Sequence, residues 1–211
     1  MSATATRRSG GRPTTTAAAL LETIILDAAT AAFLADGYAA TTIEAIARNC
    51  RVAKRTIYAR FSGKPALFRA VVGRLIARWL STTSDWAETE SLEAALTDAA
   101  ERILAVALTP EAVALHRLLI AESVRFPELP LMMQQAGAGE GTSRIAAVLD
   151  RAVARGTLPT QDTVFAAEQF LHLLLAGPQR RALGLGRPLD EQQTRVWQKS
   201  AVALFLSGVT T

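Results

Sequence analysis

One stretch of the chain, residues 42–68, limits the fold more than any other, because two short helical patterns flank a tight turn. In the first pattern Ile43, Ile46 and Ala47 recur at i, i+3 and i+4 and form one apolar face. Thr42 precedes them as an N-cap, whose hydroxyl can accept a free backbone N–H. A helix this short is not stable alone, so it has to pack against a neighbour.

The apolar pattern is interrupted between Asn49 and Val52 and resumes in a new phase at Ile57 and Phe61. The second helix is therefore rotated against the first, which predicts a helix-turn-helix arrangement. Its inner face is apolar. Its outer face is cationic and rich in hydrogen-bond donors, and consists of Lys54, Arg55, Thr56, Tyr58 and Arg60.

A cationic face on such a helix suits the major groove of DNA. Lysine and arginine donate hydrogen bonds to guanine O6 and N7, while threonine and tyrosine hydroxyls reach phosphates. The alternative is a charged face that is solvated and contacts nothing, and charge alone favours neither interpretation.

Residues 43–68 resemble the DNA-binding signature of the TetR/AcrR family of bacterial transcriptional regulators. The matching residues occur at fixed spacing and are Ile46, Ala47, Thr56, Ile57, Tyr58, Arg60, Phe61, Lys64, Leu67 and Phe68. The resemblance implies an all-α fold, with an N-terminal three-helix helix-turn-helix DNA-binding domain and a C-terminal helical ligand-binding and dimerisation domain.

We expect Lys54, Arg55 and Tyr58 to form the face that meets DNA, with Thr42, Thr56, Arg60 and Lys64 on phosphates. Lys64 lies at the start of a fourth helix, where a phosphate would meet both its ammonium and free backbone N–H groups. The DNA partner is expected to be a double-stranded, pseudo-palindromic operator bound by a homodimer.

The turn departs from the family pattern Ala-Gly-Val-Ser, because it reads Cys50, Arg51, Val52 and Ala53. Glycine tolerates a positive φ, whereas Arg51 would be strained in that conformation. Ala53 has no hydroxyl to cap the second helix, a loss of roughly 1 kcal/mol. These changes affect the local geometry and the operator sequence but leave the predicted fold unchanged.

Positive charge is concentrated at the front of the chain. Residues 1–80 carry a net charge of +8 and residues 81–211 a net charge of −4, which together give the total of +4. This asymmetry predicts phosphate contact at the front only.

Cys50 is the only cysteine, which excludes an intrachain disulfide and indicates a reducing, cytoplasmic compartment. We interpret it as a small core residue rather than a redox switch. We find no signal peptide and no uninterrupted apolar run long enough to cross a bilayer, so no membrane partner is expected.

Residues 1–16 lack periodicity and predict a disordered basic arm. Its arginines, Arg7, Arg8 and Arg12, could enter the minor groove, and the alternative is an ordinary frayed terminus. Residues 17–62 are predicted to form the helix-turn-helix domain, with a first helix that Gly37 ends, and residues 63–211 the effector-binding and dimerisation domain.

The second domain is rich in Ala and Leu, a composition that predicts helices, and Gly and Pro residues mark the ends of these helices. The expected helices are 90–108, 110–124, 128–136, 143–155, 161–176 and 190–207, with Gly177 and Pro178 ending the fifth. Residues 116–130, HRLLIAESVRFPELP, followed by an RGTL turn and the segment AAEQFLHLLLAG, resemble the C-terminal domain of the AefR-like branch of the same family, and this match covers most of residues 115–177.

Helices 161–176 and 190–207 are apolar over too wide an arc for surface helices, which predicts a four-helix interface with a second chain. The apolar residues are Val164, Phe165, Leu171, Leu173, Leu174 and Leu175 in one helix and Val196, Trp197, Ala201, Leu204 and Phe205 in the other.

The same domain offers candidates for an effector cavity, in which apolar side chains alternate with a few polar ones. These are Leu104, Leu108, His116, Leu119, Met132, Met133, Gln135, Phe170 and Leu174. Each is also compatible with an ordinary core, and His116 and His172 with structural roles. An effector would favour a conformation of this domain that holds the DNA-binding helices at the wrong separation.

The sequence gives little support to an enzyme. It contains no CxxC or HExxH metal spacing, no glycine-rich phosphate loop after a strand and no GxSxG motif. We therefore expect no catalytic residue, cofactor or metal ion. The prediction is a repressor released by a small apolar or amphipathic effector, and the alternative is a DNA-binding protein without an effector.

Overall fold

The computed structural model describes residues 15–82, 91–137 and 139–209, and within these ranges the chain forms ten helices and no strand. The predicted all-α fold is confirmed. The helices are α1 (Thr15–Ala40), α2 (Ile43–Asn49), α3 (Lys54–Tyr58), α4 (Lys64–Thr82), α5 (Leu92–Ala107), α6 (Pro110–Glu122), α7 (Glu128–Gln135), α8 (Glu140–Ala154), α9 (Thr163–Ala182) and α10 (Glu191–Val209).

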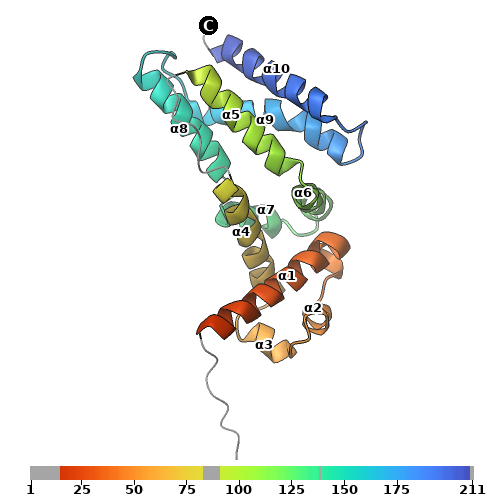
Figure 1. The fold of residues 1–211 in the computed structure, drawn as a ribbon. Helices are drawn as coiled ribbons and strands as arrows, with labels where there is room; N and C mark the ends of the chain where they lie inside the picture. The colour runs from red at the N-terminus through yellow and green to blue at the C-terminus, as the bar shows by residue number, and fades with distance from the viewer. Residues whose placement is uncertain (1–14, 83–90, 138, 210–211) are drawn as a thin grey trace, which may run out of the picture.

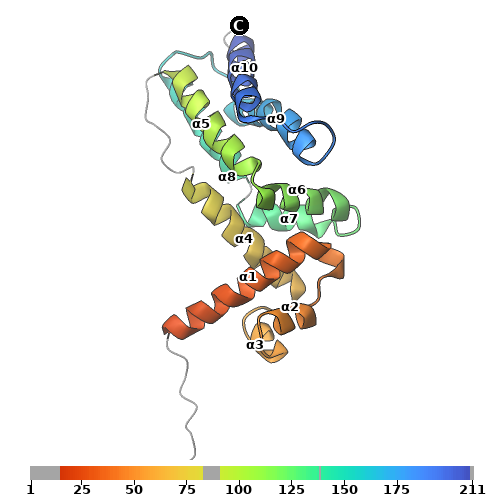
Figure 2. The same ribbon diagram turned by 45° about the vertical axis from the view of Figure 1, so that its right-hand side comes forward.

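The molecule is elongated, with α1–α3 at one end and α5, α8, α9 and α10 at the other (Figure 1). Helices α4, α6 and α7 lie between the two ends, and α4 runs from one towards the other (Figure 2). We call α5–α10 the body. Arg7, Arg8 and Arg12 of the predicted basic arm lie outside the described residues.

Helix α1 is interrupted near its end, as the sequence predicts. Gly37 has φ 83° and ψ 170°, a conformation that breaks the helical hydrogen-bond pattern. The following Tyr38 turns into the core, where its ring lies against those of Phe33 and Phe68. The break therefore directs the chain from α1 into the helix-turn-helix.

By length and hydropathy, the segment Thr16–Ala40 of α1 could cross a membrane, although Glu22 and Asp27 interrupt its apolar residues, so our expectation of no membrane partner stays a prediction. Helices α5 and α6 meet the criteria only if they are counted as one span, and they bend by 73° where they join. Core helices and N-terminal signal sequences pass the same test. In this fold Ile25, Ala29 and Phe33 of α1 are buried in the core.

Two clusters of buried apolar side chains hold the fold together. The first joins α1–α4 and also takes Leu115 and Leu118 from α6 and Leu129 and Met132 from α7. The second joins α5, α8, α9 and α10. Because α6 and α7 pack into the first cluster, they are the part of the body most directly attached to the helix-turn-helix domain. The boundary between residues 62 and 63 remains a prediction.

The predicted end of the fifth body helix is wrong, because α9 continues through Gly177 and Pro178 to Ala182. Proline has no N–H and cannot bond the carbonyl of Leu174 four residues earlier. The indole Nε1 of Trp197 on α10 donates to that carbonyl instead, at 2.9 Å. A Cβ at residue 177 would lie 2.4 Å from the Trp197 ring, so only glycine leaves room for this contact.

Candidate nucleic-acid interface and body cavities

Helix α2 begins with the predicted cap. The Thr42 hydroxyl accepts a hydrogen bond from the Ala45 N–H at 3.1 Å, which confirms its capping role. The side chain is exposed, and its hydroxyl proton remains available to donate to a phosphate. Ile43, Ile46 and Ala47 are buried, as the periodicity predicts.

The turn after α2 is a helix-terminating Schellman motif with arginine in the glycine position. The N–H of Val52 donates to the carbonyl of Ala47 at 3.0 Å, and the N–H of Arg51 to that of Arg48 at 3.2 Å. Arg51 has φ 55° and is the one non-glycine residue with positive φ in the described part of the chain. The strain expected from the sequence is therefore present.

Helix α3 is short, and its inner side is fixed by Ile57, which is fully buried, with Phe61 buried just beyond it. Ala53 occupies the N-cap position and makes no side-chain hydrogen bond there, as its lack of a hydroxyl predicts. The amino end of α3 thus depends on packing from behind rather than on capping.

Arg55 is the cation of α3 best placed to meet a ligand. Its side chain is exposed and, within the described residues, makes no hydrogen bond or ion pair. Tyr58 lies one turn further on and is 48% exposed. Two side chains with hydrogen-bonding ends therefore project from the same outer side of α3.

Lys54 is less free than the sequence suggests. Its ammonium forms an ion pair with Glu44 of α2 and lies 5.6 Å from the centre of the Tyr58 ring. The hydrogen bond between Lys54 and Glu44 raises the pKa of Lys54 and lowers that of Glu44, so both side chains stay charged at neutral pH. For Lys54 to contact DNA, it has to exchange Glu44 for a base or a phosphate.

Arg60 and Thr56 flank this face and are half-buried. Arg60 Nη1 donates to the carbonyl of Thr56 at 3.4 Å, which folds the guanidinium back along α3. The remaining guanidinium N–H groups can still donate to a phosphate.

Lys64 makes contacts inside the protein. Its Nζ donates to the carbonyl of Ala39 at 3.1 Å and lies 4.5 Å from the centre of the Tyr38 ring. Burial lowers the pKa of Lys64, and the nearby Glu122 carboxylate opposes that shift. The ammonium therefore ties the start of α4 to the end of α1.

Glu122, the last residue of α6, completes this junction and was not identified from the sequence. Its Oε1 accepts a hydrogen bond from the Ala39 N–H at 2.9 Å, so Ala39 is held on both sides, by Glu122 and by Lys64. A Cβ at Gly37 would lie 2.8 Å from the same oxygen. The Tyr38 ring also meets the ring of Phe126, with centroids 5.0 Å apart. The body thus contacts the helix-turn-helix domain through specific polar and aromatic groups.

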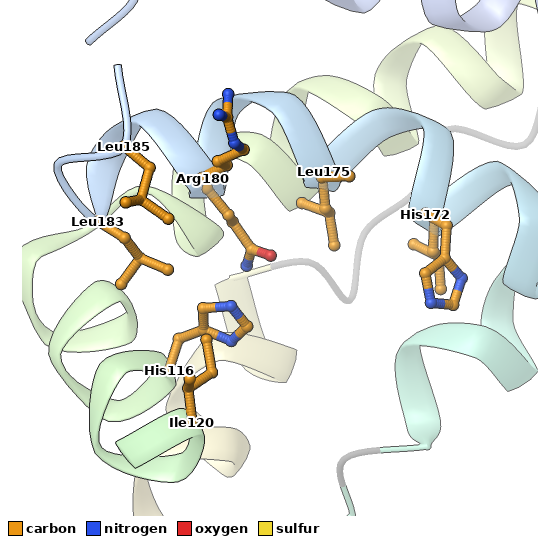
Figure 3. A pocket seen from close by; sticks show the side chains of 10 residues that line it. His116, Ile120, His172, Leu175, Arg180, Leu183 and Leu185 are labelled. Carbon is orange, nitrogen blue, oxygen red and sulfur yellow. The ribbon is translucent and has the colours of Figure 1, made fainter. Parts of the chain in front are cut away.

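The body contains two adjoining cavities. The inner cavity, of about 300 Å³, lies between α4, α5, α6 and α9 and is lined mainly by apolar side chains, including Trp79 and Leu119. The outer cavity, of about 490 Å³, lies between α6 and the second half of α9, where His116 and Ile120 face Leu183 and Leu185 (Figure 3). His116, Leu171, Leu175 and Gln179 line both.

The nine candidates for an effector cavity are distributed between these cavities and the core. His116, Leu119 and Met133 line the inner cavity. Leu104, Met132, Phe170 and Leu174 are buried in the two core clusters, and Leu108 packs against the second. Gln135 is exposed on α7. The cavity-lining Trp79, Leu171, Leu175 and Gln179 were not among the candidates.

Helices α9 and α10 expose several large apolar side chains. Val164 is 55% exposed, Phe165 57%, Val196 60% and Leu204 61%, and Leu173 is also exposed. Leu174, Ala201 and Phe205 of the predicted dimer face are instead buried in the core of the same chain. In the described ranges, no group of three or more His, Cys, Asp or Glu side chains could hold a metal ion.

Comparison with known proteins gives consistent results over most of the chain. The family described as bacterial regulatory proteins, tetR family, matches residues 25–71, and the AefR-like transcriptional repressor C-terminal domain matches residues 94–208. No curated protein matched.

Among solved structures, the chain is similar to one described as a TetR-family transcriptional regulator from Mesorhizobium loti MAFF303099, with 29% identity and a TM-score of 0.78 over 92% of this chain and 98% of that one. The flavonoid-responsive regulator FrrA is 30% identical, with a TM-score of 0.77 over 91% and 98% of the two chains. A TetR-family regulator from Pseudomonas syringae pv. tomato str. DC3000 shares the fold, at 24% identity and a TM-score of 0.70 over 88% and 94%.

Proposed function

The chain belongs to the TetR family of bacterial regulatory proteins, and from this premise we propose that it is a homodimeric repressor that a small apolar or amphipathic compound releases from its operator. It is a DNA-binding transcriptional regulator, and members of this family are not enzymes. TetR-family regulators bind DNA operators and act as dimers.

The observation that carries the proposal is the outer face of α3, which is cationic and exposed while Ile57 anchors the helix from behind. Arg55 is our choice for a base contact, because its guanidinium pairs with no group of the described residues and can donate to guanine O6 and N7. Tyr58 flanks it, and Lys54 joins them once it leaves Glu44.

The proposed phosphate contacts surround this face. They come from Thr42 and Thr56 through their hydroxyls and from Arg60 through its remaining N–H groups. At Lys64 the backbone N–H groups at the start of α4 would meet a phosphate, while the ammonium stays on Ala39. Lys64 would thus orient the phosphate site as well as contribute charge to it.

We propose that two copies associate through α9 and α10. The exposed Val164, Phe165, Val196 and Leu204 form an apolar surface that a second copy would bury. Two copies of α3 would then meet successive major grooves of a pseudo-palindromic operator. This role on DNA, with a lone half-buried cysteine, supports a cytoplasmic location.

The inner cavity supports an effector over the alternative of a DNA-binding protein without one. It is lined mainly by apolar side chains, and one similar protein is named as flavonoid-responsive. Helix α6 contributes His116 and Leu119 to the cavity and Glu122 to the junction with Ala39. A compound that shifts α6 would therefore disturb the position of the helix-turn-helix domain.

Fluorescence anisotropy with labelled operator and random duplexes, over a range of salt concentrations, tests the DNA interface. Arg55→Ala should lose about 1–3 kcal/mol on the operator and relax preference at one base pair, whereas Lys64→Ala should weaken binding to all sequences and flatten the salt dependence. Arg187→Ala, an exposed arginine in the loop after α9, is the matched control. Equal losses on operator and random DNA for both variants would refute this division of roles.

A further inference from the structure

The wall shared by the two cavities carries polar groups that the fold itself does not use. His116 on α6 and Gln179 on α9 line both the inner and the outer cavity. Within the described residues, neither side chain makes a hydrogen bond. Figure 3 shows His116 projecting from α6 towards α9, on the side where Leu175 points into the same space.

Among the described residues, none with a charged side chain lines the inner cavity, and this lining is apolar apart from His116, Gln179 and Thr142. The lining of the outer cavity includes Arg180, but its guanidinium points away from His116 (Figure 3). An ionised group of a ligand between the half-buried His116 and Gln179 would lose part of its hydration and meet no opposite charge among the described residues that line the inner cavity. The cavity therefore selects against both anions and cations.

The two polar side chains are suited to a neutral oxygen. Burial lowers the pKa of His116, so its ring is neutral at physiological pH, with one nitrogen donating and the other accepting. The amide of Gln179 likewise offers a donor and an acceptor. A hydroxyl group can donate to one of these side chains and accept from the other, and a carbonyl can accept from both.

We propose that the effector is an uncharged, mainly apolar compound whose hydroxyl or carbonyl oxygen lies between His116 and Gln179, with its apolar part in the inner cavity. This inference rests on the proposed function, because it names the class of compound that releases the repressor. It predicts that a phenol is accepted while a carboxylate or ammonium of the same size is rejected.

Isothermal titration calorimetry of the full-length protein with three two-ring compounds tests this selectivity. The probes are 2-naphthol, 2-naphthoate and 2-naphthylmethylammonium, which differ mainly in charge. We expect 2-naphthol to bind, and the two ions to bind at least about 100-fold more weakly, because a buried unpaired charge is costly. Charged probes that bind within tenfold of 2-naphthol would overturn the inference.

Substitutions test the two polar contacts. Gln179→Leu keeps the size of the side chain and removes the amide donor and acceptor that would meet the ligand, and it should weaken 2-naphthol binding by about tenfold. His116→Leu should do the same, whereas Gln134→Leu on the exposed side of α7 should leave the affinity unchanged. An unchanged affinity in Gln179→Leu would overturn the proposal even if His116→Leu fails to fold.

Operator binding without any probe separates the two proposals. A protein that binds its operator but not 2-naphthol would overturn this inference alone. A protein that ignores double-stranded DNA would overturn the proposed function. Release of operator DNA by 2-naphthol, lost in Gln179→Leu, is the result that supports both.

Discussion

Arg51 adopts a backbone conformation that glycine adopts freely, so replacing it with glycine should stabilise the protein. Its φ of 55° lies in the left-handed region, which costs a residue with a Cβ about 1–2 kcal/mol. A glycine at this position avoids that cost, but about 0.5–1 kcal/mol of the gain is lost because glycine has more conformational freedom in the unfolded chain. Because the Arg51 side chain is exposed, few contacts are lost, and Arg51→Gly should gain about 0.5–1 kcal/mol.

Arg48→Gly is the matched control: it makes the same substitution, and we expect it to lower the stability of the protein rather than raise it. Arg48 is also exposed, but it lies in the last turn of α2, where glycine costs about 1 kcal/mol. Both variants lose one positive charge from the same surface. Any difference between them therefore reports on the backbone at residue 51.

Thermal unfolding followed by circular dichroism, at one fixed protein concentration, measures this difference. For a chain of this length, 1 kcal/mol shifts Tm by about 2–4 °C, so Arg51→Gly should raise Tm by about 2 °C and Arg48→Gly lower it by about 3 °C. If both variants lower Tm equally, residue 51 is not strained and our description of the turn is wrong.

Three further predictions concern the cap, the junction and the dimer. Ala53→Ser should cap α3 and raise stability by about 1 kcal/mol in denaturant unfolding, whereas no gain would mean that another group already caps it. Glu122→Ala, which leaves the Ala39 N–H without a partner, should cost about 1–3 kcal/mol, while Glu122→Gln keeps an acceptor and should lose less; similar losses would point to the charge instead. Phe165→Asp should give monomers in light scattering, because it puts a charge on the proposed interface. Val124, whose side chain is 93% exposed and lies away from α9 and α10, provides the control, and Val124→Asp should stay dimeric. A dimeric Phe165→Asp would exclude the proposed interface.

The helices were predictable because their apolar periodicity is strong and their ends carry ordinary signals. Thr42 caps α2 and Gly37 breaks α1 as expected, since both effects depend on neighbouring residues alone. The end of α9 was not predictable. Pro178 is tolerated inside that helix because Trp197, which is distant in the sequence, donates to the carbonyl that proline leaves free.

The side chains that line the cavities were harder to predict than the helices. Periodicity identifies an apolar face but does not say which neighbour it meets. Phe170 and Leu174 therefore looked like cavity residues and are core, whereas Leu171 and Leu175 looked like dimer residues and line both cavities. The internal contacts of Lys64 were missed for the same reason, because its partner Ala39 lies on another helix.

The central claim is that α3 lies in the major groove, with a second copy of the chain presenting its own α3 one turn of DNA away. Hydroxyl-radical footprinting of the DNA upstream of the gene, combined with the mass of the complex in solution, tests it most directly. We expect two protected half-sites about 34–36 Å apart and two protein chains for each such pair. A single protected site, one chain per duplex, or no protection at low ionic strength would contradict the claim.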